Sequence, residues 1–369
     1  MQRPIPCLFM RGGTSRGPFF RAEDLPADVA TRDRVLLDVI GSPDLRQIDG
    51  LGGAHPLTSK VAIVSRGSRP GIDLEFLFAQ LQPYTDTIDT TPNCGNMLAA
   101  VVPFALEMGL IAPRGSQTTA RVLTVNTGMA CDITIDTPEG RPEYGGSARI
   151  DGVPGTAAPV LINFLDTAGS VCASMLPTGR VRDRVDLGNG SSLDVTCIDN
   201  GMPMVLVQAQ ALGRTGRETV ADLNVDAELK AQLEALRLRC SEMMGLGDTS
   251  AKNYPKMCLV SPPVAGGALA TRCFIPHVCH DAIGVLAAVT VATACVLDGS
   301  VAHDLAATPP GVVKQVSIEH PSGEFSVELE VDSENPQIIR RAALLRTARL
   351  IMRGEVMVKD KAFEPAGTR

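Results

Sequence analysis

Residues 93–108 of the chain read NCGNMLAAVVPFALEM, and residues 279–297 read CHDAIGVLAAVTVATACVL. Each segment places a cysteine in a short polar loop just before a run that is apolar on nearly every side. The spacing predicts helices over Met97–Met108 and Ala282–Leu297. A helix without a polar face is normally buried. The sequence therefore predicts two buried helices, each wrapped by other elements.

The remaining sequence supplies short apolar runs that are suited to wrap these helices. The 35 Gly and 26 Pro residues cut the chain into segments too short for most helices. Several segments have the composition of strands: Val61–Val64, Ile72–Phe78, Val122–Val125, Val205–Val207 and Phe325–Val331. Helical periodicity is confined to Ala30–Ile40 and Val225–Met244, which are expected to pack on a surface. These patterns indicate an α+β protein.

Segments of the two halves of the chain resemble each other in the same order. The pairs are residues 13–17 with 200–203, residues 60–65 (KVAIVS) with 256–261 (KMCLVS), and Cys94 with Cys279. All three pairs are separated by about half the chain length. Matches in the same order at similar separations indicate a diverged internal duplication.

The duplication predicts two similar domains, each a curved, mainly antiparallel sheet around one apolar helix. The first is expected over residues 1–165 and the second over residues 166–349. The last strand-like run, Val356–Val358, is expected to return to the first domain, so that residues 350–369 complete it. The active site is expected in the cleft between the domains, because the loops before both apolar helices would face it.

Composition excludes several classes of function. The chain has 369 residues, a net charge of −7, no Trp and only three Tyr. An acidic chain with few aromatic residues is not expected to bind nucleic acid. The longest apolar segment, residues 282–297, is short for a membrane span. The start lacks the apolar stretch of a signal peptide, and the ten cysteines form no CxxC pair. We therefore expect a cytoplasmic protein with reduced thiols.

Several long motifs together resemble the methylaconitate isomerase (PrpF) family. They are Met10–Gly17 (MRGGTSRG), Asp49–Gly53 with Leu57–Val61, Asn93–Met97 (NCGNM), Asp199–Pro203 (DNGMP), Pro276–His280, Glu319–Glu324 and Arg346–Arg349. The resemblance covers essentially the whole chain. It implies the diaminopimelate-epimerase-like fold, which agrees with the duplication inferred above.

Within that family, the motifs are most similar to those of the 4-oxalomesaconate tautomerases of protocatechuate and gallate ring-cleavage pathways. The resemblance implies transfer of a proton in a small unsaturated tricarboxylate or keto acid, by a keto–enol change or an allylic 1,3-shift. Such a reaction needs a base, donors for the developing oxyanion and an acid. It requires no metal and no organic cofactor, and no dinucleotide or phosphate-binding motif is visible.

Lys60 is the predicted base. It directly precedes an apolar strand, so its amine can project from the strand end into a partly dry cleft. Burial would lower the pKa of a lysine from about 10.4 towards the range in which a base is useful at neutral pH. The alternative is an ordinary solvated lysine that begins a strand.

Cys94 is the second catalytic candidate, because it lies at the start of the first apolar helix. A helix N-terminus lowers the pKa of a thiol, and the position matches the first acid/base cysteine of the epimerase superfamily. The alternative is a small buried apolar residue. The second half departs from the two-thiol pattern of the epimerases, since Cys279-His280-Asp281 replaces their Cys-Gly-Thr-Gly. This departure favours a mechanism centred on lysine and leaves the role of Lys256, the repeat counterpart of Lys60, open.

An acidic protein that takes a polyanion needs local donors and positive charge. The candidates for substrate binding are Arg11, Thr14, Ser15, Ser59, Asn93, Gly95, Asn96, Met97, Arg272, His280, Asp281 and Ala282. Arg16 is a further source of positive charge. His277 and His280 lack other metal ligands at readable spacing, so no metal site is expected.

Other functions remain open at the level of sequence. The nearest alternative is an aconitate or 2-methylaconitate isomerase with the same machinery. An amino-acid epimerase is disfavoured by the altered second cysteine motif. A Cys–His hydrolase would form a covalent acyl-enzyme at Cys94, and a carboxylate-binding protein would exchange no proton. The oligomeric state is not readable, and a homodimer is compatible with the sequence.

Overall fold

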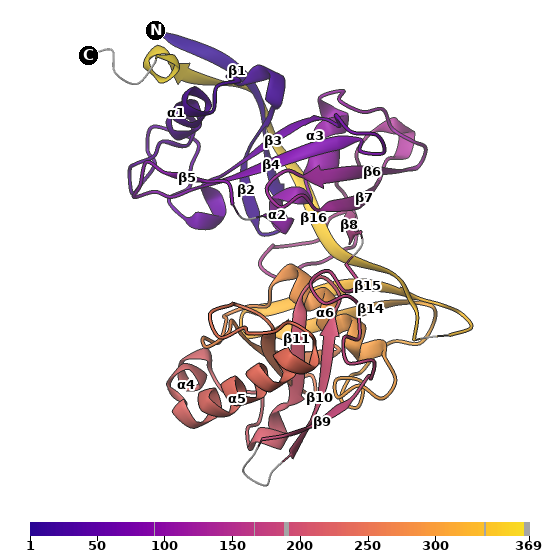
Figure 1. The fold of residues 1–369 in the computed structure, drawn as a ribbon. Helices are drawn as coiled ribbons and strands as arrows, with labels where there is room; N and C mark the ends of the chain where they lie inside the picture. Colours follow the sequence, from indigo (N-terminus) through magenta and orange to yellow (C-terminus); the bar gives the residue numbers. More distant parts are fainter. Residues whose placement is uncertain (92, 166, 188–191, 336, 365–369) are drawn as a thin grey trace. The chain divides into compact units, whose positions relative to one another are not determined.

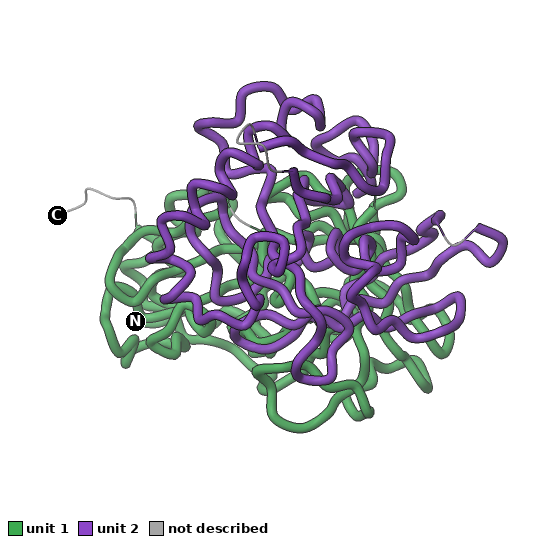
Figure 2. The backbone as a smooth tube through the Cα atoms, turned by 90° about the horizontal axis from the view of Figure 1, so that it is seen from below, with its two compact units in different colours: residues 1–165, 346–369 green, residues 166–345 purple. Residues whose placement is uncertain are grey.

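The computed structural model describes residues 1–91, 93–165, 167–187, 192–335 and 337–364. The chain divides into two units, which Figure 2 distinguishes by colour. Unit 1 comprises residues 1–165 and 346–369, and unit 2 comprises residues 166–345. Asp166, where the second domain was expected to begin, lies outside the described residues, as do residues 365–369.

Unit 1 is built on a mainly antiparallel sheet (Figure 1). Its strands are β1 (Gln2–Gly12), β2 (Ser15–Arg21), β3 (Lys60–Arg66), β4 (Leu74–Leu81), β5 (Ile88–Asp89), β6 (Gln117–Thr124), β7 (Ala130–Asp136) and β8 (Pro159–Phe164). They follow the order β1-β2-β3-β4-β6-β7-β8, with β5 beside β4. Among the strand pairs described within unit 1, only β2/β3 and β4/β6 are parallel. The helices of unit 1 are α1 (Val29–Ile40), α2 (Gly95–Leu98) and α3 (Val101–Glu107).

Unit 2 repeats this pattern of pairing. Its strands are β9 (Asp183–Asp186), β10 (Ser192–Asp199), β11 (Pro203–Gln208), β12 (Lys256–Ser261), β13 (Leu269–Phe274), β14 (Val313–His320) and β15 (Gly323–Val331). The parallel pairs are β11/β12 and β13/β14, at the places that β2/β3 and β4/β6 take in unit 1. The helices are α4 (Val220–Val225), α5 (Ala227–Met243) and α6 (Val285–Val296). The same succession of parallel and antiparallel pairs in both units is what an internal duplication produces.

One long strand, β16 (Ile339–Lys359), contributes to both units. Its first part pairs with β15, where Leu344 lies opposite Val327. Its last part pairs antiparallel with β1, where Val356 lies opposite Ile5. The run Val356–Val358 therefore adds a strand to unit 1.

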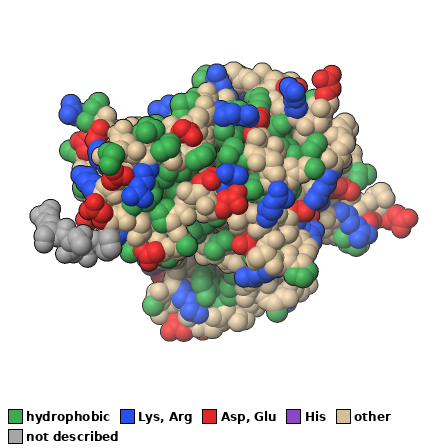
Figure 3. All heavy atoms as spheres, turned by 90° about the horizontal axis from the view of Figure 1, so that it is seen from above, with side chains coloured by type: hydrophobic (Ala, Val, Ile, Leu, Met, Phe, Trp, Pro, Cys, Tyr) green, Lys and Arg blue, Asp and Glu red, His purple; other side chains and the backbone are tan. Residues whose placement is uncertain are grey.

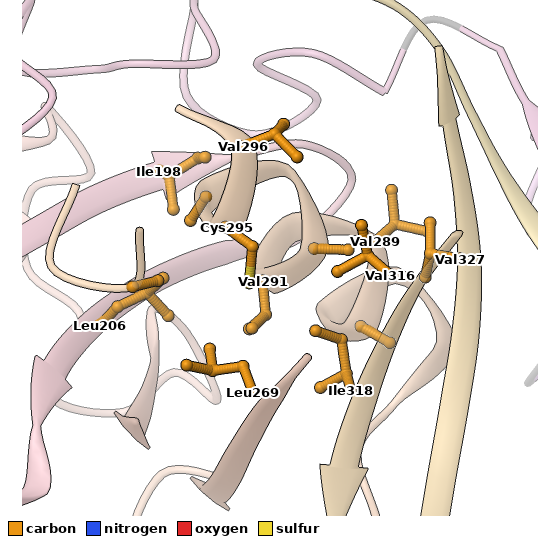
Figure 4. Packing of buried hydrophobic residues seen from close by; sticks show 14 of the residues in the cluster. Ile198, Leu206, Leu269, Val289, Val291, Cys295, Val296, Val316, Ile318 and Val327 are labelled. Carbon is orange, nitrogen blue, oxygen red and sulfur yellow. The ribbon is translucent and has the colours of Figure 1, made fainter. Parts of the chain in front are cut away.

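In each unit the sheet packs on an apolar helix, which confirms the predicted α+β architecture. Helix α6 contacts β10, β11, β14 and β15. Figure 4 shows its Val289, Val291 and Cys295 among side chains from these strands, such as Leu206 and Val327. In unit 1, α2 contacts β1 and β2, and α3 contacts β3 and β7. Small and branched side chains on every side of the helix allow strands to approach it closely.

The helix expected over Met97–Met108 is interrupted. It forms two pieces, α2 and α3, separated by a turn at residues 99–100. The cause is Pro103, which has no N–H to donate and whose ring conflicts with the carbonyl of Ala99 one turn earlier. The amides of Ala99 and Ala100 instead close tighter turns onto the carbonyls of Asn96 and Met97.

The other helix boundaries differ from expectation by a few residues. Helix α6 begins at Val285 rather than Ala282, because Gly284 is extended and takes the cap position, where glycine costs little. The helix expected over Val225–Met244 is α5 (Ala227–Met243). It begins two residues later than expected because the Asp226 carboxylate caps it by accepting the amide of Leu229 at 2.9 Å.

Charged side chains on the face drawn in Figure 3 are interspersed, with Lys and Arg next to Asp and Glu. The net charge of −7 is thus not gathered into one acidic patch on this face.

Two glycines let β1 and β2 approach the elements that carry the predicted catalytic residues. A Cβ atom on Gly17 would lie 1.9 Å from the carbonyl oxygen of Lys60, and one on Gly12 would lie 2.2 Å from the carbonyl oxygen of Asn96. No side chain fits at these distances, so only glycine permits this packing of β2 on β3 and of β1 on α2.

We expect Gly17→Ala to lower the free energy of unfolding by about 1–3 kcal/mol, because the methyl group must displace the Lys60 backbone. Urea denaturation measures the loss. Gly354→Ala is the matched control, since a Cβ at this strand position meets no atom within 4 Å and we expect a change within about 0.5 kcal/mol. Equal effects of the two substitutions would contradict this view of the β2/β3 contact.

Candidate active site

Lys60 is buried at the first position of β3. Only 7% of its surface is exposed. Its Nζ lies 4.9 Å from the centre of the Phe78 ring and donates a hydrogen bond to Oε1 of Gln80. Gln80 is the residue directly opposite Lys60 on β4. The amine is thus held by a neutral amide and an aromatic face, and among the described residues no carboxylate forms an ion pair with it.

Burial lowers the pKa of Lys60 below its ordinary value, because the charged form loses hydration. Attraction to the charged form of Cys94 opposes this shift in part. The two side chains are therefore close enough to interact electrostatically. A lowered pKa increases the share of neutral amine at a given pH, and the neutral amine is the form that removes a proton.

Gln80 is a residue that the motifs did not reveal. Its Nε2 donates to the carbonyl oxygens of Leu81 at 2.8 Å, Pro56 at 3.1 Å and Ser59 at 3.2 Å. These acceptors fix the orientation of the amide, so that Oε1 is presented to Lys60. Only the antiparallel register of β3 and β4 reveals this pair, since the two residues are twenty positions apart.

Cys94 occupies the N-cap position of α2 and is partly buried. Its amide donates to Oδ1 of Asn93 at 2.8 Å. The first backbone hydrogen bond of the helix runs from Leu98 to the Cys94 carbonyl. The preceding amides, those of Gly95, Asn96 and Met97, are therefore not used by this helix. The Met97 side chain is fully buried, so this residue can offer a ligand only its backbone.

The turn between β1 and β2 lies against the same loop. The Thr14 hydroxyl accepts a hydrogen bond from Nδ2 of Asn96 at 2.9 Å. A Cβ on Gly13, whose φ is +52°, would lie 2.1 Å from Oδ1 of Asn96. Ser15 is 1% exposed, and its Oγ has no hydrogen-bond partner among the described residues. A buried hydroxyl of this kind is a free donor for a bound molecule.

Two of the predicted binding residues are already engaged by the protein. The buried Ser59 hydroxyl bonds to Oε1 of Gln47 and to the His55 carbonyl, both at 2.9 Å. Arg11 donates to the Gly13 carbonyl at 2.9 Å and to the backbone and hydroxyl oxygens of Thr347. In this structure both side chains hold loops in place.

The remaining candidates belong to unit 2. Arg272 donates to the carbonyl oxygens of Glu218 and Thr271, both at 2.9 Å. Nδ1 of the exposed His280 accepts the amide of Ala282 at 2.9 Å, which shapes the turn before α6. The Asp281 carbonyl accepts the hydroxyl of Ser322.

Cys279 and Lys256 are the repeat counterparts of Cys94 and Lys60. Burial raises the pKa of Cys279 to about 11, although the charge of Arg272 opposes the shift. Cys279 is therefore a protonated thiol at neutral pH. Its side chain is buried, whereas Cys94 is only partly buried. Lys256 opens β12 as Lys60 opens β3, and its Nζ would lie 3.6 Å from a Cβ on Gly284.

Within the described ranges, no three His, Cys, Asp or Glu side chains are grouped as metal ligands would be. None of the helices in the described part of the chain is long and apolar enough to cross a membrane.

The two-unit architecture defines the class of fold. The structure is similar to a solved methylitaconate-delta-isomerase, with a TM-score of 0.86 and 34% identity, and the match covers 100% of this chain and 99% of that one. The expected diaminopimelate-epimerase-like fold is confirmed.

Comparison of sequences gives the particular family. The family model described as PrpF protein matches residues 2–359, and this chain belongs to the PrpF family. It is 51% identical over 357 residues to a 4-oxalomesaconate tautomerase of Pseudomonas putida, which covers 97% of both chains. It is 53% identical over 353 residues to a (4E)-oxalomesaconate Delta-isomerase of a Novosphingobium species, which covers 96% of this chain and 97% of that protein.

The contact between Gln80 and Lys60 predicts a shift in pH dependence. In Gln80→Glu a carboxylate would face the amine and stabilise its charged form, so the pKa of Lys60 should rise by about one unit or more. If Lys60 is the base, the rising limb of the activity profile should reflect loss of its proton and should move to higher pH by the same amount. Gln210→Glu, at an exposed glutamine of unit 2, is the control and should leave the limb in place. An unshifted profile in Gln80→Glu would show that the Gln80 side chain does not control the pKa of Lys60.

Proposed function

We propose that the chain is an isomerase that moves a proton between carbon atoms of 4-oxalomesaconate, with Lys60 as the base. The observation that carries the proposal is a buried lysine with a lowered pKa, oriented by a fixed neutral amide and placed within electrostatic reach of Cys94. A structural lysine would gain from a carboxylate partner. A neutral partner instead preserves the amine as a base.

In the proposed reaction, the neutral Nζ of Lys60 removes a proton from the carbon activated by the conjugated keto acid. The electron pair of that C–H bond passes into the conjugated system and forms a dienolate. A proton then returns to another atom of the same system, so that the net change is an isomerisation. The Cys94 thiol is proposed to deliver this proton and to regain one from the Lys60 ammonium.

Donors around these two residues suit the charge that develops. In the described part of the chain, the Ser15 hydroxyl and the amides of Gly95 and Asn96 have no hydrogen-bond partner. We propose that they bind a carboxylate or the dienolate oxygen. Such groups are already oriented before the reaction, so they lower the barrier at little reorganisation cost. Thr14 and Asn93 are proposed to hold this arrangement through their hydrogen bonds to Asn96 and Cys94.

The substrate is proposed from two relatives above 50% identity that are named for oxalomesaconate. The alternative is an aconitate or methylaconitate, which the same base and donors could isomerise. It is supported by a relative of Shewanella oneidensis that is 33% identical over 388 residues and is named 2-methyl-aconitate isomerase.

We further propose that the reaction takes place in the cytoplasm. All ten cysteines lie in the described part of the chain and are free thiols, which suits a reducing compartment. We also propose a homodimer, which is supported only by its compatibility with the sequence.

Lys60→Met should abolish isomerisation. NMR in deuterated buffer, with 4-oxalomesaconate as the substrate, should show a shifted double bond or exchange of a carbon-bound proton with the wild type and neither with Lys60→Met. The variant should fold normally, since replacing a buried amine by an apolar chain removes a desolvation cost. Lys361→Met, which changes an exposed lysine in the same way, should retain activity.

Three results would revise the proposal. If the enzyme turned over aconitates but not 4-oxalomesaconate, Lys60 would remain the proposed base and the proposed substrate would be wrong. Exchange that persists in Lys60→Met would remove the lysine from the mechanism. Binding of these acids by the wild type without any exchange would indicate a binding protein.

Cys94→Ser tests the second catalytic group. A serine hydroxyl has a far higher pKa than a thiol, so return of the proton should slow by about 100-fold or more while the substrate still binds. The rate of exchange at the carbon attacked by Lys60 should fall less than the rate of net isomerisation. Cys7→Ser, at a buried thiol elsewhere in unit 1, is the control. Equal loss of both rates would show that Cys94 shapes the site without transferring the proton, and trapping of an acyl group on Cys94 would indicate a hydrolase.

A further inference from the structure

Three arginines lie side by side on neighbouring strands of unit 1. Arg11 on β1 is directly opposite Arg349 on β16 and, on its other side, directly opposite Arg16 on β2. Directly opposed residues place their Cβ atoms about 5 Å apart on the same face of a sheet. The three arginine side chains therefore start in a row across three strands.

The same arginines line one cleft with a volume of about 520 Å³. This volume is in the range of sites for small molecules. The other lining residues come from β16 and the segment before β8, and all belong to unit 1: Tyr144, Gly145, Val153, Pro154, Thr156, Ala157, Ala348 and Ile351. The cleft thus combines a row of positive charge with an apolar wall.

The protein does not neutralise this row. Among the described residues, none of the three guanidinium groups has a carboxylate within ion-pair distance, although most other arginines of the sheet do. The nearby Glu107 is engaged by Arg353 and by the Tyr144 hydroxyl. Burial and the charge of Arg349 lower the pKa of Arg11. Like charges placed opposite one another destabilise a sheet, and a bound anion would remove that cost.

The row faces away from the proposed catalytic pair. Successive residues of a strand point to opposite faces of the sheet. At Gly12 and Gly17 the side-chain direction meets the backbone of Asn96 and of Lys60, respectively. Arg11 and Arg16 are the neighbours of these glycines, so their side chains start from the other face.

We propose that this cleft is a second binding site, which takes a small organic polycarboxylate. Separate carboxylates of one molecule can each meet one guanidinium, since the three arginines line the same cleft and their Cβ atoms are about 5 Å apart from strand to strand. The carbon skeleton would pack on Val153, Pro154 and Ile351. A compact phosphate would reach fewer of the arginines and leave the apolar wall exposed.

Titration calorimetry with citrate, in a buffer without phosphate, tests the site. We expect citrate to bind the wild type and Lys60→Met alike, because the cleft does not include the lysine. Arg349→Gln should weaken binding about tenfold or more, as expected for the loss of one charge-assisted contact. Added salt should weaken the binding of citrate to the wild type.

Arg66→Gln is the matched control, because Arg66 is an exposed arginine of unit 1 outside the cleft. It should bind citrate like the wild type. Arg16→Gln removes a second member of the row on a different strand and should also weaken binding, which keeps the test valid if Arg349→Gln does not fold. The proposal is overturned if Arg349→Gln and Arg66→Gln bind alike, if binding is lost in Lys60→Met, or if inorganic phosphate binds as tightly as citrate.

Discussion

The contact between the Gly17 position and the Lys60 carbonyl is the constraint on which the site in unit 1 depends. A side chain at Gly17 would overlap that oxygen, so β2 can lie beside β3 only through glycine. This packing positions the backbone at the start of β3, where Lys60 is 7% exposed. The amine itself is covered from β4, by the Phe78 ring and the Gln80 amide. Burial lowers the pKa of the lysine.

The same unit shows how a fold can bury a cation without neutralising it. Lys60 meets an aromatic ring and a neutral amide, and the amide is fixed by three carbonyl oxygens. An ion pair in this position would hold the lysine protonated. Elsewhere in unit 1, arginines such as Arg121 are paired with carboxylates. Lys60, the proposed base, therefore differs from the arginines of this unit that form surface ion pairs.

The duplicated architecture has diverged at its chemical positions. Both units repeat the order of parallel and antiparallel pairs. In both, the second strand of the first parallel pair begins with a lysine, Lys60 in β3 and Lys256 in β12. The two counterpart cysteines differ, however. Cys94 is partly exposed, whereas Cys279 is buried, and burial raises the pKa of Cys279 to about 11. The sequence had indicated only that the second motif departs from the two-thiol pattern, and it did not predict this difference in burial. The two units thus share their strand order, but the surroundings of the corresponding cysteines differ.

The sequence by itself determined the two apolar helices, most strands, the duplication and the family, because these depend on local periodicity and on long motifs. It also singled out Lys60 and Cys94. It did not reveal the break at Pro103 between α2 and α3, the Gln80 partner of Lys60 or the row of three arginines. These features depend on strand register and on close approach of segments far apart in the chain. Only the tertiary structure decides which side chains share a face, because pairing of strands is a long-range property.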